Sequence, residues 1–239
     1  MSDARYVRPT TMTVAATVVG VGAVGLTAGY LLARYHSLPD LLVVHFARTG
    51  FPNGFQFKTW GRVFVPVFVQ LALLVTLGPI AALLLSRPRT GTDAASVSDS
   101  ETADMRAAAA AAEAVALLAS IWIVVQAFAA FSLARMWERQ ISRLDWYGAV
   151  ETIAFVLTIV VAVRAHFRLG RPEPRPFVPE HWRYGQLYKN PHDPALFVPT
   201  RNGARWTLNF GRPVAAALMG VVLVIGIVAP AVILALSLR

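Results

Sequence analysis

The chain contains four long, mostly hydrophobic segments without a charged residue. They cover residues 9–33, 63–86, 114–134 and 213–238, and the shortest of them holds 21 residues. An α-helix rises about 1.5 Å per residue, so about 20 apolar residues are needed to cross the hydrocarbon core of a bilayer. In lipid the backbone must satisfy its own hydrogen bonds, and a helix does so within a single segment. The pattern therefore predicts four membrane-spanning helices.

A further apolar segment, residues 146–163, is interrupted only by Glu151, and its uncharged part is shorter than a full span. It begins with Trp146 and Tyr147 and basic residues follow it, as is typical of the two interfaces of a membrane helix. We interpret it as a spanning helix, with a re-entrant or interfacial segment as the alternative. The expected fold is an all-α membrane protein with five transmembrane helices and a short cytoplasmic module that contains a β-hairpin.

The polar segments between the helices set the expected domain boundaries. Residues 86–106 are rich in Ser, Thr, Ala and Asp, which is typical of a flexible linker. In chain order we expect two helices and an outer loop (34–62) in residues 1–85, the cytoplasmic linker 86–106, helices three and four in residues 107–166, a cytoplasmic aromatic and basic module in residues 167–213, and helix five in residues 214–239.

The distribution of Lys and Arg predicts the orientation. With the N-terminus inside, the inner segments hold 14 of these residues and the outer segments hold 8. Cytoplasmic segments of membrane proteins carry the excess of positive charge. We therefore predict a multi-pass protein of a bacterial cytoplasmic membrane, with its N-terminus in the cytoplasm and its C-terminus outside.

The composition narrows the possible functions. Only 15% of the residues are charged, whereas a soluble domain carries about 25%. There is no cysteine, which excludes disulfides, thiol catalysis and cysteine-based metal sites. The net charge of +9 is compatible with nucleic acid, but basic loops beside a membrane more often contact anionic headgroups. We expect membrane lipids and a protein as partners, no nucleic acid and no cofactor.

Two ionisable residues, Glu113 and Glu151, lie inside the expected spans. Such residues face the interior of a bundle and find partners, because charge is costly in lipid. Helix three runs outward and helix four inward, so the two carboxylates are expected at opposite ends and form no catalytic pair. Arg164 or Arg168 is the expected partner of Glu113, and snorkelling at the membrane boundary is the alternative for both glutamates.

Helix one carries Gly25 and Gly29 one turn apart. A small-xxx-small face lets another helix approach closely. The expected neighbour is a helix of the same chain, and a second copy of the chain is the alternative.

The first loop, residues 38–58, reads LPDLLVVHFARTGFPNGFQFK. Asn53-Gly54 indicates a tight turn, because both residues tolerate positive φ, and the phenylalanines are expected at the headgroup level. A metal site at His45, with His36 and Asp40 nearby, is disfavoured because no third strong ligand is placed. The candidate binding residues of this loop are Asp40, His45, Asn53 and Lys58.

This loop resembles the signature of a bacterial domain of unknown function found in SdpI-type immunity proteins. The resemblance covers about residues 10–85 and is carried by Leu38, Pro39, Asp40, His45, Phe46, Gly50, Pro52, Gly54 and Lys58. It implies that the outer loop senses or neutralises a peptide or an envelope signal. The sequence differs from that signature at Val43 and Asn53.

The module before the last helix interleaves aromatic and basic residues. Asn202-Gly203, between two short apolar runs in residues 196–210, predicts a hairpin with a two-residue turn and a positive φ at Gly203. The segment is similar to a second small domain of unknown function that recurs beside the first one, which implies a site for a regulator or another subunit. Its candidate residues are Trp182, Tyr188, Asn190, Asp193, Trp206 and Asn209.

No nucleophile–base arrangement or metal set indicates an enzyme. The leading hypothesis is a non-enzymatic membrane protein of the immunity and signal-transduction type. An accessory or structural subunit of a larger membrane complex is the alternative, and a small transporter is the third. The ligand, the protein partner and the oligomeric state do not follow from the sequence.

Overall fold

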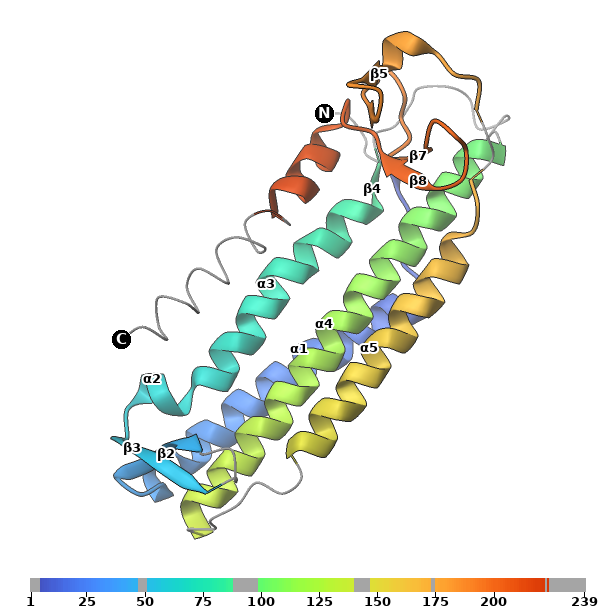
Figure 1. Cartoon of the computed structure of the whole chain (residues 1–239). Helices are drawn as coiled ribbons and strands as arrows, with labels where there is room; N and C mark the ends of the chain where they lie inside the picture. The colour runs from blue at the N-terminus through green and yellow to red at the C-terminus, as the bar shows by residue number, and fades with distance from the viewer. Residues whose placement is uncertain are drawn as a thin grey trace. The chain divides into compact units, whose positions relative to one another are not determined.

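The computed structural model describes residues 5–46, 51–87, 99–139, 147–172, 175–221 and 223. Within these ranges, four helices are long and apolar enough to cross a membrane (Figure 1). They are α1 (Thr11–Arg34), α3 (Val65–Leu85), α4 (Asp99–Arg139) and α5 (Tyr147–Leu169). Most of the expected fifth span lies outside the described residues. Where the structure does describe it, residues 213–221 are helical.

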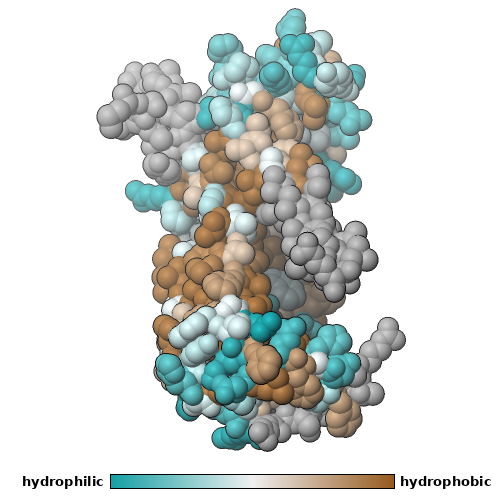
Figure 2. Space-filling model, turned by 90° about the vertical axis from the view of Figure 1, so that its left-hand side faces the viewer, coloured by the Kyte–Doolittle hydropathy of each residue, from teal (hydrophilic) through white to brown (hydrophobic). Residues whose placement is uncertain are grey.

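Large apolar side chains lie on the outside of these helices. Leu26 of α1 is 71% exposed, Val75 of α3 is 68% exposed and Phe155 of α5 is 60% exposed. Figure 2 shows hydrophobic side chains gathered over the helices. Contiguous apolar surface of this kind is costly in water, but lipid tails are as apolar as leucine. The length of the helices and their apolar surfaces are therefore those of a membrane protein.

The chain divides into two compact units. The helical unit contains residues 11–78 and 114–164, and the module unit contains residues 1–10, 79–113 and 165–239. In the helical unit, Leu31 of α1, Val63 and Ala134 of α4 are fully buried in one core cluster. Gln70 is also fully buried, and its amide Nε2 donates to Thr27 Oγ1 at 3.1 Å and to the Ile123 carbonyl at 2.9 Å. This polar contact joins α1, α3 and α4.

The glycine packing of α1 differs from the expectation. Gly25 and Gly29 are exposed, and no described atom would lie within 4 Å of a Cβ on either of them. Gly20 instead meets α4, where a Cβ would lie 3.5 Å from Ile123 Cδ1 and 4.0 Å from Ser120 Cα. The predicted packing of Gly25 and Gly29 within the chain is therefore wrong for the described residues. The buried face of α1 consists of Thr13, Ala16, Gly20, Thr27 and Leu31, and the helical period turns Gly25 and Gly29 away from it.

The segment predicted as a linker, residues 86–106, is shorter than expected. Its first residues form strand β4 (Ser86–Arg87), which pairs antiparallel with β1 (Arg5–Tyr6). Helix α4 begins at Asp99, well before the predicted start at residue 107. Asp104 is 2% exposed and accepts a hydrogen bond from the Phe197 amide at 2.8 Å. Tertiary contacts with the module thus extend this helix, which local composition alone did not indicate.

The first loop of the chain forms an antiparallel hairpin of the helical unit. After the short helix η1 (Tyr35–Ser37), strand β2 (Leu41–Phe46) pairs with β3 (Pro52–Phe57), and α2 (Trp60–Val63) leads into α3. Leu42 is fully buried, and the indole nitrogen of Trp137 in α4 donates to the Val43 carbonyl at 2.9 Å. These contacts fix the hairpin on the helices.

The module unit carries the other small strands. Helix η2 (Pro179–His181) precedes the pair β5 (Trp182–Arg183) and β6 (Leu187–Tyr188), and the pair β7 (Phe197–Pro199) and β8 (Trp206–Leu208) follows. Both pairs are antiparallel. The hairpin predicted within residues 196–210 is therefore confirmed. We call residues 175–213 the polar module.

Candidate functional site

The loop of the β7–β8 hairpin is longer than predicted. Pro199 pairs with Trp206, so residues 200–205 form the connection instead of a two-residue turn. The Thr200 hydroxyl accepts from the Arg205 amide at 3.1 Å, and Asn202 Oδ1 accepts from the Ala204 amide at 3.1 Å. These polar side chains close the larger loop. Gly203 has φ 66°, so the predicted positive φ is confirmed and the predicted turn length is wrong.

Asn209 holds the polar module together. Its side chain is fully buried, and Nδ2 donates to the carbonyls of Asn190 (2.8 Å), Asp193 (3.1 Å) and Ala195 (3.2 Å). Its Oδ1 accepts from the amides of Asn190 at 3.0 Å and Gly211 at 2.9 Å. Because every polar atom of this amide serves the backbone, Asn209 is a framework residue of the module.

Asp193 and Tyr188 are joined on the same framework. Asp193 Oδ1 accepts from the Ala195 amide at 2.9 Å, which forms an Asx turn. Its Oδ2 accepts from the Tyr188 hydroxyl at 3.0 Å and from Arg175 Nη1 at 3.0 Å. Burial raises the pKa of the Tyr188 hydroxyl above its ordinary value; the hydrogen bond from Asn190 opposes this shift, and the charge of Asp193 adds to it.

The indole of Trp206 attaches the β7–β8 hairpin to the end of α5. Its Nε1 donates to the carbonyls of Leu169 at 3.0 Å and Gly170 at 3.2 Å. Leu169 is the last residue of α5, where carbonyls lack a partner within the helix. Gly170 has φ 61°, the conformation that favours glycine after a helix. Trp206 is therefore a positioning residue and not part of an open site.

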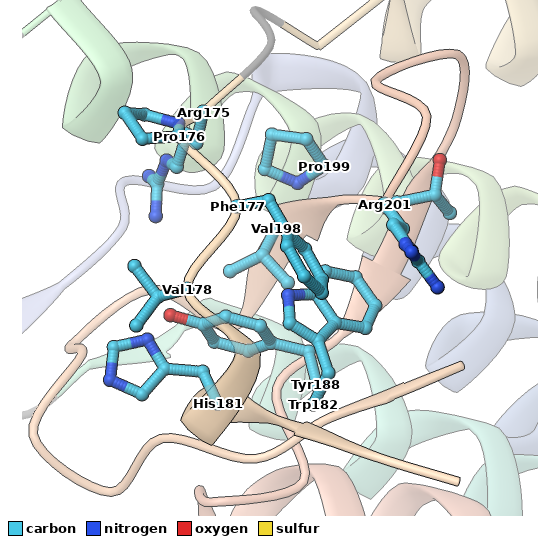
Figure 3. A pocket seen from close by; sticks show the side chains of 11 residues that line it. Arg175, Pro176, Phe177, Val178, His181, Trp182, Tyr188, Val198, Pro199 and Arg201 are labelled. Carbon is cyan, nitrogen blue, oxygen red and sulfur yellow. The ribbon is translucent and has the colours of Figure 1, made fainter. Parts of the chain in front are cut away.

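A cavity of about 450 Å³ lies beside this framework (Figure 3). The predicted residues Trp182 and Tyr188 line it, and their ring centroids are 5.4 Å apart with an interplanar angle of 74°. Phe177 adds a third ring, 6.3 Å from Trp182 and tilted by 32°. The remaining lining residues are Arg175, Pro176, Val178, His181, Val198, Pro199, Thr200 and Arg201.

Cationic side chains stand at the edge of this cavity. The guanidinium of Arg201 lies over the ring of Phe177, 4.6 Å from its centroid, and Arg175 is paired with Asp193. In Figure 3, His181 and Arg201 lie on opposite sides of the Trp182 and Tyr188 rings. Among the residues that the structure describes, the lining contains two arginines and a histidine but no carboxylate. The cavity therefore combines flat apolar walls with positive charge.

The sequence reasoning missed Arg175, Phe177, His181 and Arg201. They come from the proline-rich stretch before β5 and from the β7–β8 loop, and no motif connects these two segments. An available signal was the repeated Pro-x pattern of residues 172–179, which favours extended backbone that exposes side chains. Of the six residues predicted for the module, Trp182 and Tyr188 line the cavity, whereas Asn190, Asp193, Trp206 and Asn209 support it.

The four residues predicted as a site in the first loop form two separate pairs. Lys58 Nζ lies 3.4 Å from Asp40 Oδ1 and donates to the Leu38 carbonyl at 2.6 Å. His45 Nδ1 hydrogen-bonds Asn53 Oδ1. The first pair joins the residues that flank the hairpin, and the second joins the two strands within it. The structure therefore brings the four residues together pairwise and not into one cavity.

The expected Asn53-Gly54 turn is also corrected. Both residues lie in β3, where Gly54 pairs with His45 at a register shift. A Cβ on Gly54 would lie 2.7 Å from His45 Cβ, which is too close for two carbon atoms. Glycine is required here by a close approach of the two strands rather than by a turn.

The glutamates in the spans have different surroundings. Glu113 of α4 is 3% exposed, pairs with Arg168 and accepts from the Thr10 hydroxyl at 2.6 Å. The expected partner Arg168 is thus confirmed. Glu151 of α5 is exposed. Among the described residues, no group of three or more His, Asp or Glu side chains is arranged to hold a metal ion.

Comparison with known proteins adds one local similarity. No curated protein and no solved structure matches the chain. The resemblance of the first loop to SdpI-type proteins stays a prediction. The segment of residues 191–215, which contains β7, β8 and Asn209, matches the model of a family described as a family of unknown function (DUF5808).

Proposed function

We propose that this chain is a non-enzymatic membrane protein of the signal-transduction type, which recognises its signal through the polar module. The observation that carries the proposal is the cavity of about 450 Å³ with aromatic walls and cationic edges. Ligand sites in proteins are typically concave, largely apolar and equipped with a few oriented polar groups. The lining arrangement fits that description better than any grouping in the first loop.

The framework around the cavity supports a recognition role. Asn209 and Asp193 fix the backbone that carries Tyr188 and the β7–β8 hairpin. A site held by buried hydrogen bonds loses little conformational freedom when it binds. Loops on rigid scaffolds commonly carry binding residues. The module is therefore suited to binding rather than to a mere connection between two helices.

The positive charge of residues 164–212 supports a cytoplasmic position of the module. This segment holds nine of the 22 Lys and Arg residues, and such an excess favours the inner side of the membrane. In the proposed topology the N-terminus is cytoplasmic, five helices cross a bacterial cytoplasmic membrane and the C-terminus is outside. The signal bound by the module is then an intracellular one.

The proposal is tested by complementation of a deletion strain. The full chain, Arg201→Gln and the matched control Arg205→Gln are expressed at equal membrane abundance, and transcript profiles are compared. Arg205 lies in the same loop and is exposed, but it does not line the cavity. The expected result is restoration of the wild-type profile by the full chain and by Arg205→Gln only. Restoration by Arg201→Gln as well would contradict recognition through the cavity.

A second candidate function is that of a subunit in a larger membrane complex. It is favoured by an apolar groove of about 460 Å³ on α1, α4 and α5 of the helical unit, lined by Ala16, Val19, Ser120 and Ile153 among others. Small residues allow close approach of a helix in lipid. Under this alternative, Ile153→Trp shifts the detergent-solubilised protein to a lower mass on a native gel. Under the leading proposal, the mass stays unchanged.

A further inference from the structure

The size and the walls of the cavity in the polar module indicate a small, flat ligand. Its volume of about 450 Å³ lies in the range of sites for small molecules, about 300–1,000 Å³. Phe177, Trp182 and Tyr188 present three rings at centroid distances of 5.4 and 6.3 Å. At these distances the three rings pack against one another as aromatic pairs. They form one aromatic wall, and Phe177 is still 45% exposed, so a planar ligand can pack against it.

The charges at the cavity favour a ligand with negative charge. Arg175 is held by Asp193 at 3.0 Å, which satisfies its charge within the framework. Arg201 is exposed and lies over Phe177, and among the residues that the structure describes it forms no ion pair. A guanidinium presents a planar fork of N–H donors that fits a carboxylate or a phosphate. An aromatic cage alone would suit a cation, but the cationic lining disfavours one.

We propose that the cavity binds a soluble aromatic anion, that is, a small molecule with one planar ring system and one phosphate or carboxylate group. The ring packs against the open side of the cluster formed by Phe177, Trp182 and Tyr188, and the anionic group is held by Arg201. This inference rests on the proposed recognition function and names the chemical class of the ligand. The proposal involves binding only and no chemical step.

The test uses the full chain in nanodiscs of zwitterionic lipid and isothermal titration calorimetry. Three probes separate the parts of the ligand: phenyl phosphate has the ring and the anion, inorganic phosphate has the anion alone, and phenyltrimethylammonium has the ring with the opposite charge. Phenyl phosphate is expected to bind more tightly than either of the others. Preference for phenyltrimethylammonium, or equal binding of all three, would overturn the proposal.

Variants link the binding to the named residues. Arg201→Gln is expected to weaken phenyl phosphate about tenfold, the usual effect of losing a charged hydrogen bond. Phe177→Leu is expected to weaken it about threefold to tenfold through loss of a ring contact, and Arg205→Gln is expected to leave it unchanged. Equal losses of phenyl phosphate affinity in Arg201→Gln and Arg205→Gln would assign the binding to general surface charge and contradict the proposed site.

Three further outcomes distinguish a soluble ligand from a lipid headgroup, and a wrong ligand class from a wrong function. If anionic lipid in the nanodisc abolishes phenyl phosphate binding, the site takes a lipid headgroup and the soluble ligand is wrong. If no probe binds while complementation still requires Arg201, the ligand class is wrong and the proposed function stands. If Arg201→Gln complements fully although phenyl phosphate binds as expected, the proposed function fails and the binding site stands.

Discussion

The chain has two hairpins that each contain an Asn-Gly pair, and they use it differently. In the β2–β3 hairpin the pair lies within a strand, where Gly54 permits His45 to approach. In the β7–β8 hairpin Gly203 takes a positive φ in the connecting loop. The same dipeptide thus serves a close contact in one region and a turn in the other. The difference shows that the register of the flanking strands decides the role of such a pair.

The outer surfaces of the two regions differ as well. The β2–β3 hairpin exposes Phe55 and Phe57, and its polar candidates are engaged in the Asp40–Lys58 and His45–Asn53 pairs. The polar module instead keeps an open cavity beside a framework built on Asn209. One hairpin is therefore suited to a membrane interface, where aromatic side chains are enriched. The other region is suited to binding a solute.

The largest expected effect is that of Asn209→Ala in the polar module. It removes a buried amide that makes five hydrogen bonds to the backbone, so we expect a loss of about 3 kcal/mol or more in the stability of the module. Limited proteolysis of the full chain checks this as faster cleavage between residues 175 and 213. Arg205→Gln, a side-chain change at an exposed position of the same module, is the control. Equal cleavage of the two variants would contradict the framework role of Asn209.

A pair of glycine substitutions compares the two regions directly. In Gly211→Ala, the new Cβ would lie 2.3 Å from the Asn190 carbonyl carbon, whereas in Gly54→Ala it would lie 2.7 Å from the His45 Cβ. An overpacked site typically loses about 1–3 kcal/mol of folding stability. Gly54→Ala is expected to fall within that range. Gly211→Ala is expected to lose more, because the backbone moves less readily than a side chain. Thermal unfolding measures both. Gly61→Ala, where no described atom lies within 4 Å, serves as the neutral control, and the reverse order would contradict the described contacts.

The ion pair between Asp40 and Lys58, beside the first hairpin, is expected to contribute less to the stability of the protein. Asp40 is 94% exposed at its side chain, and exposed ion pairs are worth about 0–1 kcal/mol. Asp40→Asn should therefore change the melting temperature of the purified protein only slightly. Lys58→Met should have a larger effect, because Lys58 also donates to the Leu38 carbonyl. A larger loss in Asp40→Asn than in Lys58→Met would show that the charge pair dominates.

The smallest expected effect is the pH dependence contributed by Tyr188. Its pKa is raised by burial above the ordinary value of 10.0, so the folded module favours the protonated hydroxyl. The corresponding stability is present below the unfolded pKa and is lost as the pH rises through the higher folded pKa. Unfolding between about pH 9 and about pH 11 should become easier with rising pH. Tyr188→Phe should reduce the slope of stability against pH in this range. An unchanged slope would assign the pH dependence to other groups.

Much of the fold followed from the sequence because it depends on local patterns. The uncharged runs predicted most of the helices, and Asn202-Gly203 between two short apolar runs predicted the β7–β8 hairpin. The early start of α4 could not be predicted, because the hydrogen bond between Asp104 and Phe197 joins segments about 90 residues apart in the chain.

The candidate site was predictable only in part. Trp182 and Tyr188 were identified from the aromatic content of the module, and both line the cavity. Arg201 was not, because an arginine in a polar loop is unremarkable until the fold places it over Phe177. In α1 the spacing of Gly25 and Gly29 predicted packing against another helix, but the buried residues of α1 lie on a different face.

The most direct test of the account sets the two regions against each other in one assay. The deletion strain receives Arg201→Gln of the polar module or His45→Ala of the first hairpin, each at the membrane abundance of the unchanged chain. If the polar module recognises the signal, His45→Ala restores the wild-type transcript profile and Arg201→Gln does not. Restoration by Arg201→Gln together with failure of His45→Ala would contradict the account and would place recognition in the first loop.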